Sequence, residues 1–237
     1  MIDILERINE PSLATFIQQL QNDGFGLLNR LITDAECDEL INQYHSPSSY
    51  RKSVVMERYG YGLGEYKYFS YPLPALIESL RKQMYPLLVP IANTWMDQLH
   101  KNIEFPGSHD ELLKQCAENG QLKPTALILK YHKGGFNKLH QDLYGDIFFP
   151  MQLVIFLSEP GRDYTGGEFV LMQQEPRAQS KAIVLQPKKG DVLVFTTNYR
   201  AAKGKNRYFK ANMKHGVSEV HYGERFTLGL IFHDALS

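Results

Sequence analysis

The chain has 237 residues, of which 43% are hydrophobic, so it is long enough to bury one substantial core. Its 26 basic and 26 acidic residues balance, which excludes a general electrostatic attraction to nucleic acid or to a membrane. The two cysteines, Cys37 and Cys116, are too few for a disulfide framework and lack the spacing of a zinc site. With no signal peptide and no apolar run of membrane-spanning length, we expect a soluble cytoplasmic protein without a membrane partner.

The first half of the chain is expected to be mainly helical. Apolar residues at helical spacing predict a helix over Ser12–Leu20. Thr33 and Glu36 form a capping box that opens a second helix, which is expected to end near Tyr44. Further helices are expected at residues 75–100 and 110–119, and short strands at 25–28 and 54–56. Two prolines inside the stretch 75–100 predict a kink or a division into two helices.

The segment Arg58–Lys67 combines three glycines at every second position with tyrosines and charged residues. A phosphate-binding loop requires a different glycine spacing within a strand–turn–helix frame, so we reject nucleotide binding here. Two interpretations stay open. The segment is either a substrate-facing loop or an irregular strand with exposed tyrosines.

From Pro124 onward the pattern changes to short strands joined by tight turns. Strands are expected at residues 125–131, 151–157, 167–172, 182–186, 192–196, 213–220 and 225–232. A long basic loop is expected between the strands at 192–196 and 213–220. Because no crossover helices intervene, the strands predict an antiparallel sheet closed as a sandwich or jelly roll. We therefore expect an α+β protein with one domain, residues 1–237, in which a mainly helical part (1–121) packs against a jelly-roll core (122–237).

Candidate metal ligands lie in the segment between the first two of these later strands. His140 and Asp142 are separated by one residue, and in extended backbone such residues point to the same face. A second imidazole, His215, follows far downstream. Two histidines and one carboxylate that leave further positions open are the ligand set of non-haem Fe(II) oxygenases. These three residues are therefore our candidate metal site.

A candidate anion site accompanies this ligand set. Arg225 follows His215 by ten residues and begins the last expected strand. Alternation along that strand places Arg225 and Thr227 on one face. A guanidinium binds a carboxylate through two hydrogen bonds, and the hydroxyls of Thr227 and Tyr131 add further donors. We expect Arg225 to receive an acidic co-substrate.

On the residue pattern alone, two alternatives stay open. His140 and His215 are also explained as hydrogen-bonded structural histidines near a turn, because short motifs occur by chance. His233 and Asp234 form a rival donor pair. That pair ends the sheet instead of entering a loop, so His140 and Asp142 are preferred.

The order of these residues resembles that of the 2-oxoglutarate/Fe(II)-dependent dioxygenases. The segments GEYKYFSYPLP, LHQDLYG, LSEPGRDYTGGEFVL, MKHGVSEV and TLGLIFHD are similar to one bacterial family of these enzymes, so the likeness spans nearly the whole chain. That family is described as an oxygenase acting on damaged DNA, akin to AlkB-type dealkylases. The AlkB-type enzymes also tend to carry further arginines downstream of the distal histidine, whereas this chain has only Arg225 there.

The resemblance implies a double-stranded β-helix core and a set of cofactors. It assigns Fe(II) to His140, Asp142 and His215, and the far carboxylate of 2-oxoglutarate to Arg225, assisted by Tyr131 and Thr227. It also implies that O2 is consumed, that 2-oxoglutarate leaves as succinate and CO2, and that a C–H bond of the substrate is hydroxylated or oxidatively dealkylated.

The substrate is open at this level. Nine basic residues with interleaved aromatic residues occur in the stretch Lys181–Lys214, a composition that suits contact with a nucleic-acid backbone and its bases. A solvated basic loop explains the same composition. The alternatives to nucleic acid are a protein side chain, as for prolyl hydroxylases, and a small metabolite. A non-catalytic jelly-roll module that binds a ligand in the same cavity is the alternative to an enzyme.

Overall fold

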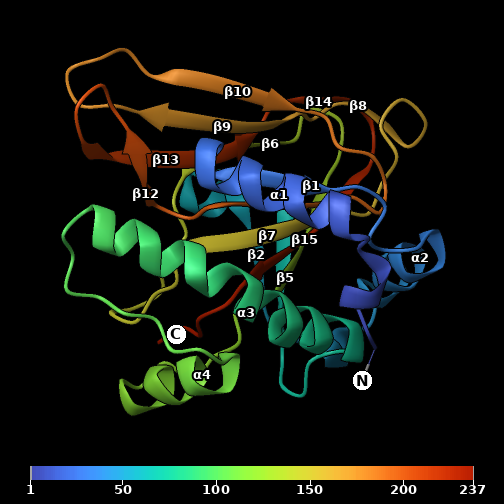
Figure 1. Ribbon diagram of the computed structural model, residues 1–237. Coiled ribbons are helices and arrows are strands. Elements are labelled where there is room, and N and C mark those ends of the chain that lie inside the picture. Colours follow the sequence, from blue (N-terminus) through green and yellow to red (C-terminus); the bar gives the residue numbers. More distant parts are fainter. Residues whose placement is uncertain (1, 237) are drawn as a thin grey trace.

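The computed structural model describes residues 2–236, and its framework is a pair of facing antiparallel sheets (Figure 1). The larger sheet has seven strands in the order β1 (Phe25–Leu28), β11 (Val192–Thr196), β7 (Met151–Phe156), β15 (Arg225–Ile231), β5 (Leu127–Tyr131), β4 (Glu65–Phe69) and β2 (Tyr50–Val55). The smaller sheet has the order β10 (Lys181–Leu185), β9 (Phe169–Gln174), β13 (Tyr208–Val217), β6 (Phe136–His140) and β3 (Gly62–Leu63), with β12 (Tyr199–Lys203) also paired to β13. A short pair, β8 (Tyr164–Gly166) and β14 (Val220–Gly223), completes the strands.

Strand β7 shows how the layers are held together, because all six of its residues are buried. Alternate side chains of a strand point to opposite faces of its sheet. Leu153 and Ile155 join the core under the helices, whereas Val154 and Phe156 join the core between the two sheets. An apolar strand in the middle of the larger sheet therefore serves both packing layers.

Four helices lie outside the sheets: α1 (Glu10–Asp23), α2 (Asp34–Gln43), α3 (Ala75–Gln98) and α4 (His109–Glu118). Helices α1 and α3 lie across the face of the larger sheet that points away from the smaller one (Figure 1). Side chains of α3 such as Leu80, Met84 and Leu88 are fully buried in that interface. The prediction of a jelly roll with helices packed against it is confirmed.

The ends of the helices follow from local sequence. The capping box predicted at Thr33 and Glu36 is present, with both reciprocal hydrogen bonds formed at the start of α2. Asn9 caps α1, which ends at Gly24 in the left-handed conformation that glycine adopts at little cost.

Helix α3 is one continuous element in spite of Pro86 and Pro90, so of the two predicted alternatives, a kink or a division into two helices, the division is wrong. The helix is long, but neither it nor any other helix within residues 2–236 has the continuous apolar stretch needed to cross a bilayer.

Two parts of the chain differ from expectation. The expected basic loop is a β-hairpin, β12–β13, in which Ala201 pairs with Lys210 and Lys203 with Tyr208. In addition, the first part of the chain supplies strands to both sheets: β1 pairs with β11, β4 pairs with β5, and β3 pairs with β6. Both differences arise from pairing between distant segments, which local composition does not report.

Candidate active site

A cavity of about 510 Å³ lies between the two sheets and contains all of the predicted site residues. Both sheets line it, the larger through β5, β7 and β15 and the smaller through β6 and β13. A cavity of this size, apolar with a few convergent polar groups, is typical of a small-molecule site.

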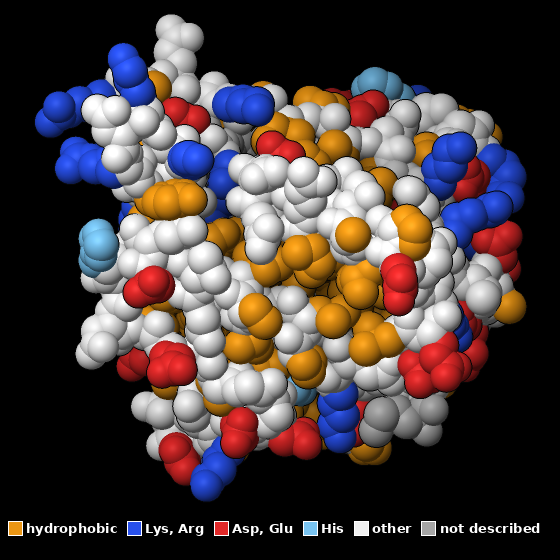
Figure 2. Space-filling model, in the orientation of Figure 1, with side chains coloured by type: hydrophobic (Ala, Val, Ile, Leu, Met, Phe, Trp, Pro, Cys, Tyr) orange, Lys and Arg blue, Asp and Glu red, His pale blue; other side chains and the backbone are white. Residues whose placement is uncertain are grey.

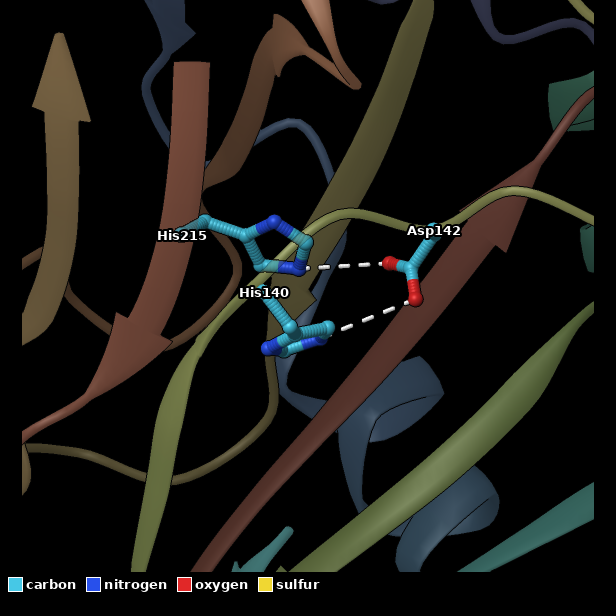
Figure 3. Close-up of side chains that lie close together, drawn as sticks. All are labelled: His140, Asp142 and His215. Carbon is cyan, nitrogen blue, oxygen red and sulfur yellow. Dashed lines mark ion pairs between the residues drawn. The ribbon is translucent and has the colours of Figure 1, made fainter. Parts of the chain in front are cut away.

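His140 and His215 face each other because β6 and β13 are neighbours, and these two residues are paired in register. Their ring centroids are 4.2 Å apart. Asp142 lies two residues beyond the end of β6 and turns its carboxylate toward both rings (Figure 3). Its Oδ2 lies 3.2 Å from Nε2 of His215, and its Oδ1 lies 3.6 Å from Nε2 of His140. One donor atom from each residue lies within 4.8 Å of the others, which is close enough to share one ion.

The hydrogen bonding of His140 leaves one ring nitrogen free to act as a ligand. Its Nδ1 lies 2.7 Å from the carbonyl oxygen of Lys138, which only accepts hydrogen bonds, so Nδ1 carries the proton. Nε2 then presents its lone pair toward Asp142. Metal-binding histidines are commonly oriented by a hydrogen bond of this kind at the second nitrogen.

Asp142 is held by neighbours on both of its oxygens. Tyr144 donates to Oδ1 at 3.1 Å, and the amide of Gln152 donates to Oδ2 at 3.0 Å. Burial by itself would raise the pKa of Asp142, but the hydrogen bonds from His215 and Gln152 help to outweigh it, and that pKa lies below its usual value. The carboxylate is therefore ionised and oriented for a cation.

Gln152 and Tyr144 were not predicted from the sequence. Gln152 is the one polar side chain of β7, a strand in which every residue is buried, and a buried polar residue in an apolar strand is a usable signal. Tyr144 lies two residues after Asp142, but its partner is fixed by the turn and not by any periodic pattern.

Arg225 lines the same cavity and is 1% exposed. It sits opposite Tyr131 in the register of β15 and β5, and its Nη1 lies 3.4 Å from the hydroxyl of Thr227. The guanidinium carbon lies 5.6 to 5.8 Å from the ring centroids of Tyr131, Phe156 and Tyr164. The predicted pairing of Arg225 and Thr227 on one face is thus what the structure shows.

The polar atoms around Arg225 lack partners. Its Nε and Nη2 and the hydroxyl of Tyr131 are buried without a hydrogen bond. Within residues 2–236, no carboxylate lies within ion-pair distance of this guanidinium. A buried and unpaired charge costs several kcal/mol, so the chain is built to receive an anion here. The carboxylate of 2-oxoglutarate fits this requirement, as a divalent metal ion fits the His-Asp-His set.

The rival pair, His233 and Asp234, has a structural role. His233 Nδ1 accepts a hydrogen bond from the backbone amide of Phe149 at 3.1 Å, and burial lowers the pKa of His233 to about 4. Asp234 forms an ion pair of 2.9 Å with Arg81, which is also buried. The two side chains are therefore engaged with different partners.

None of the nine Lys and Arg side chains of the stretch Lys181–Lys214 lines the cavity, although Phe195 of the same stretch does. Lys189 is buried in an ion pair with Asp38, and Arg200 is buried in hydrogen bonds to Gln173 and to its neighbour's carbonyl. Other members gather at the tips of the β9–β10 and β12–β13 hairpins, where Figure 2 shows Lys and Arg side chains at one corner of the molecule.

Comparison with known proteins gives relatives in sequence and in structure. Residues 64–235 match the model of a family described as an oxygenase catalysing oxidative methylation of damaged DNA. Two uncharacterized proteins of Mycobacterium tuberculosis strains are each 46% identical over 167 residues, which cover 70% of this chain and 72% of theirs.

Two solved structures share the fold at low sequence identity. A prolyl-4-hydroxylase of Pseudomonas putida has a TM-score of 0.55 at 16% identity, with 92% of this chain and 97% of that chain covered. An oxidoreductase of the 2OG-Fe(II) oxygenase family from Burkholderia pseudomallei has a TM-score of 0.51 at 19% identity, with 96% and 94% covered.

The family match covers most of the chain, and it meets a jelly-roll fold with a set of two histidines and one carboxylate in its cavity. The predictions of the superfamily and of an oxygenase are therefore confirmed. The chain shares the fold of the 2-oxoglutarate/Fe(II) oxygenases and belongs to the oxygenase family described as catalysing oxidative methylation of damaged DNA.

Proposed function

We propose that His140, Asp142 and His215 hold Fe(II), and that Arg225, with Tyr131 and Thr227, binds the far carboxylate of 2-oxoglutarate. One observation carries this assignment: the three metal-type donors and a buried guanidinium without an anion share a single cavity. Neither group is explained by the packing of the chain alone. The two together match one metal and one dicarboxylic co-substrate.

When bound, Fe(II) and 2-oxoglutarate supply the oxidative chemistry, in which O2 is consumed and succinate, CO2 and an oxidised substrate are formed. The chain contributes position and environment. Gln152 and Tyr144 fix the Asp142 carboxylate, and the backbone of Lys138 fixes the ring of His140. Such preorganised supports commonly change metal affinity by about 10- to 100-fold.

Arg225 acts by charge and geometry. Its guanidinium is held away from water among three aromatic rings, where electrostatic attraction to a carboxylate is stronger than at the surface. The free Nε and Nη2 and the hydroxyl of Tyr131 are donors directed into a site that lacks an acceptor. Arg225 therefore selects a ligand with a second carboxylate in addition to the end that reaches the metal.

As substrate we infer a modified base of nucleic acid, with hydroxylation or oxidative dealkylation of a C–H bond next to a ring atom. The description of the matched family supports this class. The cavity supports it as well, because the aromatic side chains of Tyr61, Tyr66, Tyr68 and Tyr144 line it together with aliphatic residues.

The assignment is tested by succinate formation from 2-oxoglutarate with Fe(II), first without a primary substrate and then with alkylated oligonucleotides. We expect His140→Ala and Arg225→Ala to abolish turnover, the first through loss of Fe(II) binding and the second through loss of 2-oxoglutarate binding. His221→Ala and Arg207→Ala are matched controls, because both side chains are exposed and lie outside the cavity.

Wild-type protein that binds no Fe(II) and releases no Fe(II)-dependent succinate would contradict the assignment. If a proline-containing peptide, and not an alkylated oligonucleotide, stimulates succinate formation, the cofactor assignment stands and the inferred substrate class is wrong.

A further inference from the structure

The segment Arg58–Lys67 is built into the wall of the active site. It contains the end of the 3-10 helix η3 (Met56–Tyr59) and strand β3, whose residues Gly62 and Leu63 pair with β6. The carbonyl oxygen of Tyr61 accepts a hydrogen bond of 2.9 Å from the backbone amide of Lys138. Since β6 ends at His140, this segment forms the border of the cavity beside a predicted metal ligand.

Two exposed tyrosines form a flat surface on this border. The rings of Tyr59 and Tyr61 are stacked, with centroids 5.5 Å apart and planes inclined by 18°. Tyr59 is 57% exposed and Tyr61 is 48% exposed, although large aromatic side chains usually bury most of their area. Tyr61 lines the cavity, and Tyr59 extends the stack away from it. We refer to this pair as the aromatic shelf.

Apolar side chains continue the shelf around the opening. Leu139 and Leu143 flank the His140–Asp142 segment, line the cavity and are 39% and 52% exposed. Apolar groups that gather at the opening of a cavity, exposed to water, mark a contact surface for a ligand. We therefore expect a ligand that binds at this opening to present an apolar surface.

Positive charge is the second feature of this border. Lys52 and Lys138 line the cavity, both side chains are exposed, and neither forms an ion pair within residues 2–236. Arg58 precedes the shelf and is exposed as well. Ammonium groups without a carboxylate partner, next to an apolar shelf, suit a ligand that carries both flat rings and anionic groups.

We propose that the aromatic shelf is a binding subsite for an unpaired base of single-stranded nucleic acid, with Lys52 and Lys138 contacting the phosphates on either side of it. This proposal rests on the function proposed above and names the form in which the substrate is taken. Every base has a π face that stacks on an aromatic side chain, and a basic border follows the backbone. In a duplex both faces of a base are covered by its neighbours, so the shelf is accessible only to an unstacked base.

Binding of a fluorescein-labelled single-stranded oligodeoxynucleotide of about a dozen nucleotides, followed by anisotropy, tests the shelf. We expect Tyr61→Ala and Tyr59→Ala to weaken binding at least about fivefold, because stacking is the interaction removed. Tyr61→Phe keeps the ring and should bind like the wild type. Tyr222→Ala is the matched control, because Tyr222 is 68% exposed but does not line the cavity.

The contribution of charge is measured by the salt dependence of the same binding. Lys52→Gln should reduce the slope of log affinity against log salt concentration by about 0.7, the value for one phosphate contact on a single strand. Lys205→Gln is the matched control, at the tip of the β12–β13 hairpin and outside the cavity. If Lys205→Gln lowers the slope and Lys52→Gln does not, the strand follows the basic corner and the proposal is wrong.

Succinate formation without oligonucleotide separates this proposal from the enzymatic assignment. Tyr59→Ala, whose side chain does not line the cavity, should retain wild-type Fe(II)- and 2-oxoglutarate-dependent succinate release in the absence of a primary substrate. If the wild type releases succinate but Tyr61→Ala binds the oligonucleotide as tightly as the wild type, the shelf proposal fails alone. Tighter binding of the duplex than of the single strand would overturn it too. If the wild type releases no succinate, the enzymatic assignment is wrong, whatever the result of the oligonucleotide binding.

Discussion

The hydroxyl of Tyr144 donates a hydrogen bond of 3.1 Å to Oδ1 of Asp142, and Tyr68 in turn donates to Tyr144 at 3.0 Å. Burial, followed by the nearby charge of Asp142, raises the pKa of Tyr144 well above 10. The phenol therefore stays protonated at any working pH and remains a donor. The two linked hydroxyls therefore fix the position of Oδ1 of Asp142, a proposed metal ligand.

Tyr144→Phe should weaken Fe(II) binding about tenfold, because it removes one of the two hydrogen bonds that Asp142 receives from residues outside the proposed ligand set. Turnover at saturating Fe(II) should change less than the affinity. Titration of succinate release with Fe(II) gives both quantities. Tyr68→Phe is the control, since its hydroxyl reaches Tyr144 but not Asp142, and it should have a smaller effect. Unchanged Fe(II) affinity in Tyr144→Phe would refute a positioning role.

Gly167→Ala should raise the KM for 2-oxoglutarate about tenfold while Fe(II) binding is retained. An added Cβ at position 167 would lie 2.9 Å from Cδ of Arg225, so the guanidinium must shift, and small displacements of binding groups are costly. Gly167 also has φ +62°, a left-handed conformation that costs alanine about 1 kcal/mol. Gly161→Ala isolates this backbone cost, because Gly161 has φ +84° and open space around it. Equal KM values in the two variants would show that Arg225 is not displaced.

Asp234→Asn should destabilise the fold by about 3 kcal/mol, because it leaves the buried guanidinium of Arg81 without its counter-ion. Arg81 also donates to the carbonyl oxygen of Phe232 at 2.7 Å and cannot turn toward water. Urea unfolding at neutral pH measures the loss. Lys82→Met is the comparison, since its pair with Glu78 is exposed and should contribute less than about 1 kcal/mol. Similar losses in both variants would argue against a structural role for the buried pair.

The stability of the protein should fall as the pH is lowered from about 6.5 toward 4. Burial, followed by the charge of Arg81, lowers the pKa of His109 to about 3 in the folded protein. The unfolded chain then binds a proton near pH 6.5 that the folded protein does not bind, so acid favours unfolding. The cost is at most about 1.4 kcal/mol per pH unit for this residue.

His109→Gln should remove the contribution of His109 to the pH dependence of the free energy of unfolding. Nε2 of His109 lies 2.9 Å from the carbonyl oxygen of Phe232, and the amide of glutamine offers a donor without a titrating group. Urea unfolding of both proteins at several pH values between 4 and 7 gives the comparison. An identical slope in the two proteins would mean that His109 is protonated in the folded state.

The convergence of His140, Asp142 and His215 was predictable because short-range periodicity and one long-range strand pairing agree. Alternation places His140 and Asp142 on one side, and the in-register pairing of β6 and β13 then brings His215 opposite. The capping box of α2 was readable for the same reason, since all of its contacts lie within four residues.

What the sequence did not reveal depends on partners far away in the chain. The stretch between residues 196 and 213 has the composition of a loop, yet most of it forms a hairpin with a turn at residues 204–207 and arms fixed by the register of β12 and β13. From the sequence alone, Lys189 and Arg200 would be taken for exposed charged residues. In the structure, each is buried against a partner from another segment. The support of Asp142 by Gln152 likewise needs β7 to lie beside the site.

The position of β15 between β7 and β5 has a consequence for biosynthesis. During synthesis on the ribosome, β5 and β7 are both made well before β15, the strand that joins them. Until β15 is made, β5 and β7 each expose the apolar strand edge that later pairs with it. Edges of this kind invite association between chains before folding is complete. Arg225 lies on that same joining strand, so the proposed co-substrate pocket would be completed only when β15 closes the sheet, and a chain synthesised only as far as β7 would lack the guanidinium proposed to bind 2-oxoglutarate.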